Sequence, residues 1–257
     1  MNPPVRAVIF DWGGTLTPWH TVDVPAIWRQ TYADLAHPDD EAAASDLAQI
    51  LSTVDAAASA TGRIEHRSAR LEDILATAAH QAGLTLEHLD TAAARTAYEA
   101  AWAPYTITDP AVLSLWTWLR ERGLAVGVLS NTIWSRDYHR GLFARDGVLH
   151  LIDADVYSSE LDYVKPHPET FAMAAAAIGI DPVECVYVGD RLYEDVWGPQ
   201  RVGLKTIHVP HSAIPADQLV DTDATPDAVA HDLADVAGIV TGWIGHGSQA
   251  ASSADAR

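Results

Sequence analysis

Short apolar runs alternate with segments of helical periodicity in the second half of this chain, and one more apolar run precedes them near the start. The apolar runs lie at residues 5–10, 124–129, 154–157, 183–188 and 206–209. Helical spacing of apolar residues marks the segments 110–122, 134–144, 168–178 and 194–202. Wholly apolar strands that alternate with helices are typical of a parallel sheet covered on both faces. The pattern predicts a Rossmann-like, three-layer α/β/α core.

A stretch with a different character separates the first apolar run from the others. Residues 25 to 103 are rich in alanine and contain no strand pattern. Their periodicity and their glycine and proline positions predict helices at 25–35, 40–58, 66–82 and 86–102. We therefore expect a core made of residues 1–18 and 106–244, an inserted all-helical domain at 19–105, and a disordered tail at 245–257.

Polar residues with chemical potential follow the predicted strands. Asp11 ends the first strand, Ser130 and Asn131 follow the second, Asp190 follows the strand at 183–188, and Lys165 lies in a loop before a helix. The carboxyl ends of parallel strands open on one edge of the sheet, where ligands gather. These side chains are therefore expected to share one crevice.

This combination is suited to chemistry on phosphate groups. A carboxylate such as Asp11 can attack phosphorus and form an aspartyl-phosphate. A hard cation such as Mg²⁺, held by Asp190 and Asp195, would offset the repulsion between that carboxylate and the phosphoryl oxygens. Lys165 would neutralise further oxygens, and Ser130 would donate a hydrogen bond to them. The sequence thus predicts a hydrolase that acts on phosphate with Asp11 as nucleophile.

The charge balance limits the partners. The formal net charge is −19, and such a surface repels nucleic acid and anionic membranes. An anionic substrate would need a bound metal and local cations. Only two lysines are present, Lys165 and Lys205, so each is easily tested. A small phosphorylated metabolite remains the expected partner, with the protein as a monomer or homodimer.

The other composition data favour a cytoplasmic, globular protein. With 48% hydrophobic and 20% charged residues, the chain can bury a core. The single cysteine, Cys185, lies in an apolar run and permits no disulfide framework, which fits a reducing compartment. We find no signal peptide at the N-terminus and no apolar run of the roughly 18 residues that a membrane helix needs.

Four segments, in order, resemble the motifs of the haloacid dehalogenase superfamily, most of whose members are phosphatases. FDWGGTL at 10–16 is similar to the first motif, Asp-x-Asp-Gly-Thr-Leu, and LSNT at 129–132 to the second. SSE at 158–160 through KPHPETF at 165–171 is similar to the third, and VGDRLYEDV at 188–196 to the fourth. Each motif alone is a weak signal, but four in order are a strong one. The helical insert is similar to that family's helical cap, which closes over the substrate.

The resemblance implies roles for individual residues. It makes Asp11 the nucleophile and a metal ligand, and it makes Asp190 a ligand of Mg²⁺, with Asp195 a ligand or a holder of metal-bound water. It also implies that Lys165 holds Asp11 and the phosphate in place. Ser130 and the neighbouring amide of Asn131 bind phosphate, and Trp12 belongs to the same phosphate-binding set.

One departure from the family pattern concerns proton transfer. The family's phosphatases carry a second aspartate two residues after the nucleophile, and here Gly13 stands in that place. The carbonyl of Gly13 can still coordinate the metal, but no side chain is left to act as general acid and base. Such a group contributes roughly 10²–10⁴-fold to the rate. We expect a slow phosphatase, a substrate with a good leaving group, or a substitute acid.

Two branches of the family also lack that aspartate. The dehalogenase branch uses no metal, and the acidic fourth motif argues against it. The phosphonoacetaldehyde hydrolase branch has the similar motif Asp-Trp-Ala-Gly-Thr but needs a cap lysine, and residues 17–107 contain no lysine. An enzyme that hydrolyses a C–X or C–P bond therefore remains an alternative to the phosphatase. A protein that binds Mg²⁺ and phosphate without turnover is another alternative.

Three residues are candidates for contact with substrate or for the missing acid. His20 lies just after the first motif, and Arg63 and His66 lie in the segment 62–67, which we predict to be a break between two cap helices. In helical caps of this family the corresponding loop often faces the active site. His20 is the first choice for a substitute acid.

Overall fold

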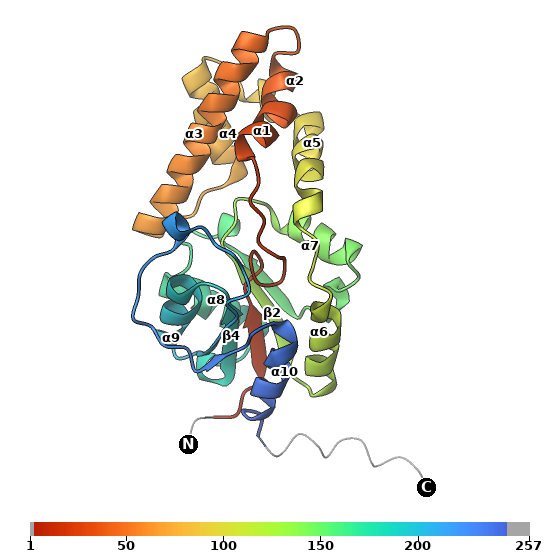
Figure 1. Cartoon of the computed structure of the whole chain (residues 1–257), viewed down its shortest axis with the longest axis vertical. Helices are drawn as coiled ribbons and strands as arrows, with labels where there is room; N and C mark the ends of the chain where they lie inside the picture. The colour runs from red at the N-terminus through yellow and green to blue at the C-terminus, as the bar shows by residue number, and fades with distance from the viewer. Residues whose placement is uncertain (1–2, 246–257) are drawn as a thin grey trace.

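The computed structural model describes residues 3–245 and contains a parallel sheet with helices on both faces, next to a separate group of helices (Figure 1). The strands follow the order β3-β2-β1-β4-β5-β6, and every pair is parallel. Their bounds are β1 (Ala7–Phe10), β2 (Ala125–Ser130), β3 (Ala154–Tyr157), β4 (Cys185–Gly189), β5 (Lys205–His208) and β6 (Ala228–Val229). The predicted α/β fold class is confirmed.

The strand order reverses beside β1, because β2 lies on one side of it and β4 on the other. Phe10 pairs with Val128 of β2 and with Val188 of β4, so these three strands end at the same level. A reversal of strand order leaves a crevice at the carboxyl edge of the sheet, where ligands of open α/β folds bind. Asp11 and Asp190 follow the two strands that flank this crevice.

Side chains along the central strands point alternately to the two faces of the sheet, so each strand contributes to two separate hydrophobic cores. Val8 and Phe10 belong to the apolar cluster that packs against α6, α7 and α10, whereas Ala7 and Ile9 belong to the cluster that packs against α8. The core helices are α6 (Ala111–Glu121), α7 (Arg136–Arg145), α8 (Pro168–Ile178), α9 (Gly198–Gln200) and α10 (Leu233–Thr241). Burial on both faces explains why the strands have no polar side.

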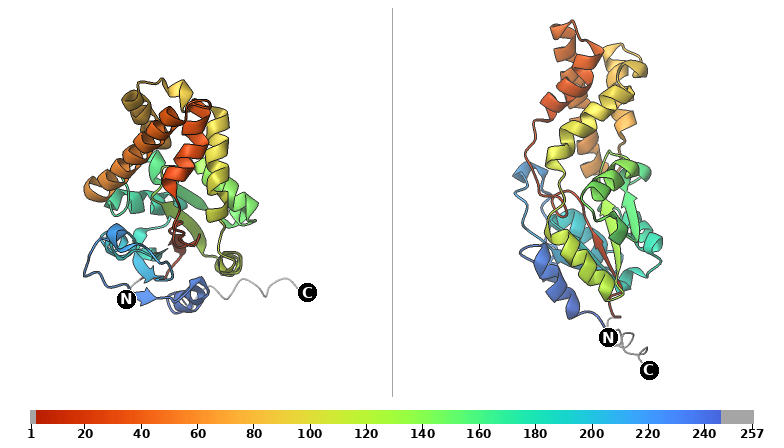
Figure 2. Two further views of the ribbon diagram at one scale, coloured as in Figure 1. Left: turned by 45° about the horizontal axis from the view of Figure 1, so that its top comes forward. Right: turned by 90° about the vertical axis from the view of Figure 1, so that its right-hand side faces the viewer.

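The inserted helices have a hydrophobic core of their own. Buried residues such as Trp28, Tyr32, Leu51 and Leu75 pack on one another and form a cluster distinct from the two clusters of the sheet. The helices are α1 (Val24–Trp28), α2 (Asp34–Ala36), α3 (Glu41–Glu65), α4 (Leu71–Ala82) and α5 (Ala92–Trp102). They stand over the carboxyl edge of the sheet, at the opposite end of the molecule from α10 (Figures 1 and 2).

A second connection joins the insert to the core besides the two chain crossings. The backbone of Ser68 donates to Asp162, and that of Val164 donates to His66. Arg70 Nε donates to the carbonyl of Ser159 at 2.7 Å. The segment after α3 is therefore bonded directly to the loop that carries Lys165.

The break between the second and third insert helices differs from the prediction. The predicted break at 62–67 lies inside α3 for most of its length, because α3 continues through Gly62 to Glu65 and ends at His66, whose φ is 54°. One interior glycine costs a helix only about 1 kcal/mol, which the packed apolar face of α3 offsets. Accordingly α4 begins at Leu71 instead of residue 66.

The C-terminal part of the core domain also differs from the prediction. The strand β5 is not the last one, because the two residues of β6 pair with it and α10 then follows. So short a strand leaves no periodicity to detect. The predicted helix at 194–202 is a π-helix at Leu192–Trp197 followed by α9.

The structure tests two further expectations in part. Although α3 is 25 residues long, neither it nor any other helix within residues 3–245 is long and apolar enough to cross a membrane. Of the tail predicted to be disordered, only Gly245 belongs to the described residues, and 246–257 lie outside them.

Candidate active site

Asp11 lies directly after β1, and its side chain meets the ammonium group of Lys165. The backbone N–H of Asp11 donates to Val188 of β4 at 2.9 Å, which continues the sheet by one residue and fixes the position of the carboxylate. Asp11 Oδ1 lies 2.7 Å from Lys165 Nζ, and both side chains are buried. Burial raises the pKa of Asp11 to about 6, although the positive charge of Lys165 opposes this rise.

Lys165 has three partners at its ammonium group. Besides Asp11, Nζ lies 2.8 Å from Asp195 Oδ1 and donates to the hydroxyl of Tyr187 at 2.8 Å. Burial by itself lowers the pKa of Lys165, but the carboxylates of Asp11 and Asp195 outweigh burial and hold the pKa well above its usual value. Lys165 is therefore a permanent positive charge inside the site.

Asn131 holds the backbone of Lys165 in place. Its side-chain Nδ2 donates to the carbonyl of Lys165 at 3.0 Å, and its Oδ1 accepts from the N–H of Lys165 at 2.8 Å. Because both ends of the amide are used, a contact between Asn131 and phosphate would have to come from its backbone. The neighbouring Ser130 is buried, and in the described part of the chain its hydroxyl reaches only the carbonyl of Asn131, at 3.4 Å. That hydroxyl is the freer donor of the two.

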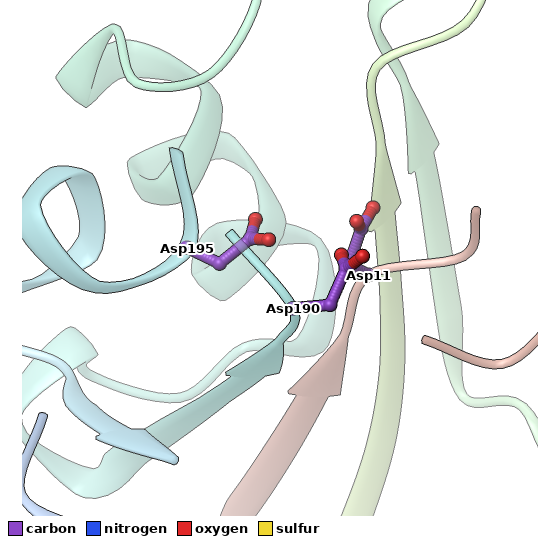
Figure 3. Close-up of side chains that lie close together, drawn as sticks. All are labelled: Asp11, Asp190 and Asp195. Atoms are coloured by element: carbon purple, nitrogen blue, oxygen red, sulfur yellow. The ribbon is translucent and has the colours of Figure 1, made fainter. Parts of the chain in front are cut away.

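Three carboxylates converge at the ends of β1 and β4 (Figure 3). Asp11, Asp190 and Asp195 each offer an oxygen within 4.8 Å of the other two. Within residues 3–245, Asp190 Oδ2 is buried and has no hydrogen-bond partner, while Oδ1 accepts only a 3.4 Å bond from Thr15. Burial, together with the charges of Asp11 and Asp195, raises the pKa of Asp190 to about 8.

This donor set fits Mg²⁺. An unpaired buried carboxylate oxygen is costly, and oxygen ligands from carboxylates are those that a hard divalent cation prefers. Asp190 has the free oxygen, and Asp11 uses one oxygen for Lys165. Asp195 is more occupied, because its Oδ2 also accepts from the N–H of Arg191 at 3.0 Å. The geometry therefore makes Asp190 the strongest candidate ligand of the three.

Two glycines allow this crowding. Gly14 has a φ of 86°, and a Cβ there would lie 2.2 Å from Asp190 Oδ2. At Gly189 a Cβ would lie 2.4 Å from the Cβ of Asp195. Gly13 is different, because no atom of the described residues, its chain neighbours apart, lies within 4 Å of the place where its Cβ would stand. The missing family aspartate is therefore not excluded by lack of space.

A cavity of about 530 Å³ lies between the carboxylates and the inserted helices. Asp11, Ser130 and Lys165 line it from the core, and Arg63 lines it from α3. His20 also lines it, with its ring against Tyr105 at a centroid distance of 5.8 Å. The structure thus brings together most of the site residues predicted from the sequence.

His66 is placed differently from His20 and Arg63. It is not among the residues that line the cavity, and its Nε2 lies 3.4 Å from the hydroxyl of Tyr193. Burial lowers the pKa of His66. Trp12 lines the cavity, but its indole packs against His139 at a centroid distance of 4.5 Å, so its expected phosphate contact falls to its backbone.

Sequence reasoning missed Tyr187, which is fully buried on β4. Its hydroxyl accepts from Lys165 and donates to the carbonyl of Leu129 at 2.9 Å. The residue lies within an apolar run, where a tyrosine reads as an ordinary core residue. Only the meeting of β4 with the Lys165 loop reveals its position in the site.

Comparison with solved structures places the fold among hydrolases of two kinds. A HAD phosphatase from Thermococcus onnurineus superposes with a TM-score of 0.62 at 21% identity, covering 93% of this chain and 99% of that one. A 2-haloacid dehalogenase from Pseudomonas syringae pv. Tomato DC3000 gives 0.64 at 20% identity, with the same coverage. At this level of identity the likeness shows the fold alone.

Curated relatives are named as phosphatases. The glyceraldehyde 3-phosphate phosphatase of Methanopyrus kandleri is 32% identical over 136 residues, which are 53% of this chain and 58% of that protein. Pyrophosphatase PpaX of Bacillus pumilus is 30% identical over 122 residues, which are 48% and 54% of the two chains. The matched segments thus span little more than half the length of these relatives. The family model described as haloacid dehalogenase-like hydrolase matches residues 5–203, and the chain therefore belongs to that family.

Proposed function

We propose that this protein is a Mg²⁺-dependent phosphatase that hydrolyses a small phosphate monoester through an aspartyl-phosphate on Asp11. The observation that carries the proposal is the position of Asp11. Its carboxylate lies 2.7 Å from Lys165, within 4.8 Å of oxygens of Asp190 and Asp195, and on the wall of a 530 Å³ cavity. The phosphatase names of the relatives support the same class of substrate.

In the proposed reaction an oxygen of Asp11 forms a bond to phosphorus while the bond from phosphorus to the ester oxygen breaks. The ester oxygen leaves as an alcohol with a proton taken from solvent, since Gly13 offers no acid. A water molecule then attacks phosphorus, releasing inorganic phosphate and regenerating the carboxylate. Lys165 holds Asp11 in place and balances charge on the phosphoryl oxygens, and Ser130 donates to one of them. Asp190 and Asp11, with the carbonyl of Gly13 and Asp195, would hold Mg²⁺, which would supply the remaining positive charge.

The inserted helices act in this proposal as a cap over the site. We assign residues 19–105 to the cap and residues 1–18 and 106–244 to the core, since the helices pack on a core of their own and form one side of the cavity. The substrate is a small phosphorylated metabolite. The cytoplasmic location and the choice between monomer and homodimer stay predictions from the sequence.

A second candidate is a protein that binds Mg²⁺ and a phosphorylated ligand without turnover. One observation favours it: at Gly13 no side chain replaces the family's acid and base, and the place is open. A leaving group with a low pKa needs little protonation, so a substrate of that kind separates the two candidates.

The test is hydrolysis of para-nitrophenyl phosphate with and without Mg²⁺, with the Asp11→Asn variant as control. We expect turnover that needs Mg²⁺ and is lost in Asp11→Asn, together with phosphate on Asp11 in acid-quenched protein by mass spectrometry. The melting temperature of the variant checks that it is folded. No turnover above the variant at any Mg²⁺ concentration would favour the binding protein, and turnover that ignores Mg²⁺ would contradict the proposed metal.

A further inference from the structure

The cap places one acidic side chain on the wall of the catalytic cavity. Asp55 of α3 lines the same cavity as Asp11 and Lys165. Its Oδ2 accepts a hydrogen bond from Trp28 Nε1 at 3.0 Å. Trp28 is fully buried in the cap and stacks on Tyr98 at a centroid distance of 4.7 Å. The carboxylate therefore stands at the boundary between the cap core and the cavity.

Nothing within residues 3–245 neutralises this carboxylate, because Asp55 takes part in no ion pair there. Burial raises its pKa, as expected for a carboxylate that has lost water without gaining a cation. Burying a carboxylate that has no cationic partner costs folding free energy. The hydrogen bond to Trp28 does not require the charge, since a neutral acceptor such as asparagine would also accept it, although more weakly.

Aromatic side chains line the cavity together with Asp55. Tyr98, Trp102 and Tyr105 all contribute to its wall. Tyr98 and Trp102 meet edge to face at 6.3 Å, and Trp102 meets Tyr105 in the same way at 6.4 Å. Aromatic faces attract an ammonium group, and a carboxylate adds a charge-assisted hydrogen bond. A carboxylate on a wall that also carries aromatic side chains is suited to bind an organic cation.

The helix α3 extends from this region toward the phosphate end of the cavity. Its last residue, Glu65, precedes His66, whose carbonyl accepts from Val164 next to Lys165. Arg63 also lines the cavity near this end. At about 1.5 Å per residue, Asp55 lies about 12 Å along the helix from Arg63. Lys165 and Arg63 thus supply positive charge toward the phosphate end of the cavity, whereas Asp55 lies further along α3, inside the cap.

We propose that Asp55, with Tyr98 and Trp102, binds an ammonium group at the end of the substrate opposite to its phosphate. The substrate class is then a phosphate monoester that carries an amine on a chain of several carbons. This inference rests on the proposed phosphatase function and names the substrate class of the same cavity.

The test compares matched substrates. Monophosphates of ω-aminoalkyl chains of two to eight carbons are assayed beside n-alkyl and ω-hydroxyalkyl monophosphates of the same length. The readout is the ratio of kcat/KM between amine and alkyl substrates, because general damage to the enzyme cancels in a ratio. We expect a ratio of at least about tenfold at the best chain length, as one hydrogen bond between charged groups provides.

Asp55→Asn removes the charge and keeps an acceptor for Trp28, and it should bring the ratio close to one. The control is Asp46→Asn, which makes the same charge change at an exposed position of the same helix outside the cavity wall. It should leave the ratio as it is. An unchanged ratio in Asp55→Asn, or hydroxyalkyl substrates as good as the amines, would overturn the inference.

A binding measurement separates this inference from the proposed function. Calorimetry with non-hydrolysable ω-aminoalkyl phosphonates, against alkyl phosphonates, should show a preference for the amine that Asp55→Asn removes. If that preference is found but para-nitrophenyl phosphate is not hydrolysed, the phosphatase proposal fails and the ammonium site stands. If para-nitrophenyl phosphate is hydrolysed but neither assay shows a preference, the ammonium site fails alone.

Discussion

The hydroxyl of Tyr187 accepts a hydrogen bond from the ammonium group of Lys165 at 2.8 Å. The same hydroxyl donates a hydrogen bond to the carbonyl of Leu129 in the sheet, at 2.9 Å. The position of Lys165 is thus tied to β2 and β4, although the residue itself lies in a loop.

Tyr187→Phe removes that hydroxyl and leaves the carbonyl of Leu129 without this donor. Hydrogen bonds to charged groups are worth about 1.5–3 kcal/mol, so we expect the free energy of unfolding to fall by about that much in a urea titration. The control is Tyr157→Phe. Tyr157 is equally buried, but its hydroxyl has no partner within residues 3–245, so its loss should change stability little. Equal losses in the two variants would contradict a special contact at Tyr187.

Gly13→Asp restores the carboxyl group that the family's phosphatases use for proton transfer. A Cβ at Gly13 meets no clash with the described residues outside its chain neighbours. For an alkyl phosphate, whose leaving group needs a proton, we expect kcat to rise roughly 10²–10⁴-fold, and for para-nitrophenyl phosphate much less. Gly13→Asn has nearly the same size without the acid, so it should not rise. If both variants behave alike, or if Gly13→Asp loses activity, the native site has its own proton donor.

Gly14→Ala should abolish the response to Mg²⁺, because the added Cβ would lie 2.2 Å from Asp190 Oδ2. The positive φ of 86° adds roughly 1–2 kcal/mol of backbone strain. Gly179→Ala is the matched control, since Gly179 has a φ of 77° and, among the described residues outside its own chain neighbourhood, no atom lies within 4 Å of its Cβ position. Both variants should lose stability, but only Gly14→Ala should lose the rise in melting temperature on adding Mg²⁺. A normal response in Gly14→Ala would argue against Asp190 as a ligand.

Stabilisation by Mg²⁺ should increase with pH. Burial raises the pKa of Asp190 to about 8 and that of Asp11 to about 6, from a usual 3.8. Because the folded state holds these protons more tightly than the unfolded state, metal-free protein loses stability as the pH rises from about 4 to 8. Protons compete with the metal over the same range.

The measurement is the melting temperature with and without Mg²⁺ at pH 5.5 and pH 8.5. We expect a larger rise on adding Mg²⁺ at the higher pH, and no rise at either pH in Asp190→Asn. A rise of the same size at both values in the wild-type protein would contradict metal binding at these carboxylates.

His139 should make the protein sensitive to acid independently of the metal. It is buried between Tyr157 and Trp12, with its ring stacked on Tyr157 at 4.3 Å, and burial lowers its pKa from 6.5 to about 3. A lowered pKa gives stability that is complete above pH 6.5 and is lost as the pH falls toward 3. At pH 4.5 this amounts to about 2–3 kcal/mol.

His139→Phe keeps the ring and removes the titration, so the loss of stability between pH 7 and pH 4.5 should be smaller by that amount in urea unfolding. His150→Asn replaces an exposed histidine and should leave the pH dependence unchanged. If His139→Phe loses as much stability as the wild-type protein on acidification, His139 is not the sensitive group.

The local pattern of the sequence was enough for the class of fold and for most of the site. Apolar runs between helices determine a parallel sheet, because strands buried on both faces cannot alternate with polar residues. In such a sheet the residue after each strand lies at the carboxyl edge, which brought Asp11, Ser130 and Asp190 together without knowledge of any distance.

Only the tertiary structure decided contacts between segments far apart in the chain. The pairing of Tyr187 with Lys165 depends on how a loop crosses the end of β4, and no local pattern encodes it. The extent of α3 through Gly62 likewise followed from packing of the cap, which outweighs a weak local preference. Asp55 lines the cavity because α3 stands over the sheet, a placement set by the cap core and by its bonds to the Lys165 loop. Periodicity specifies which face of an element is buried, whereas the partner of that face depends on the whole chain.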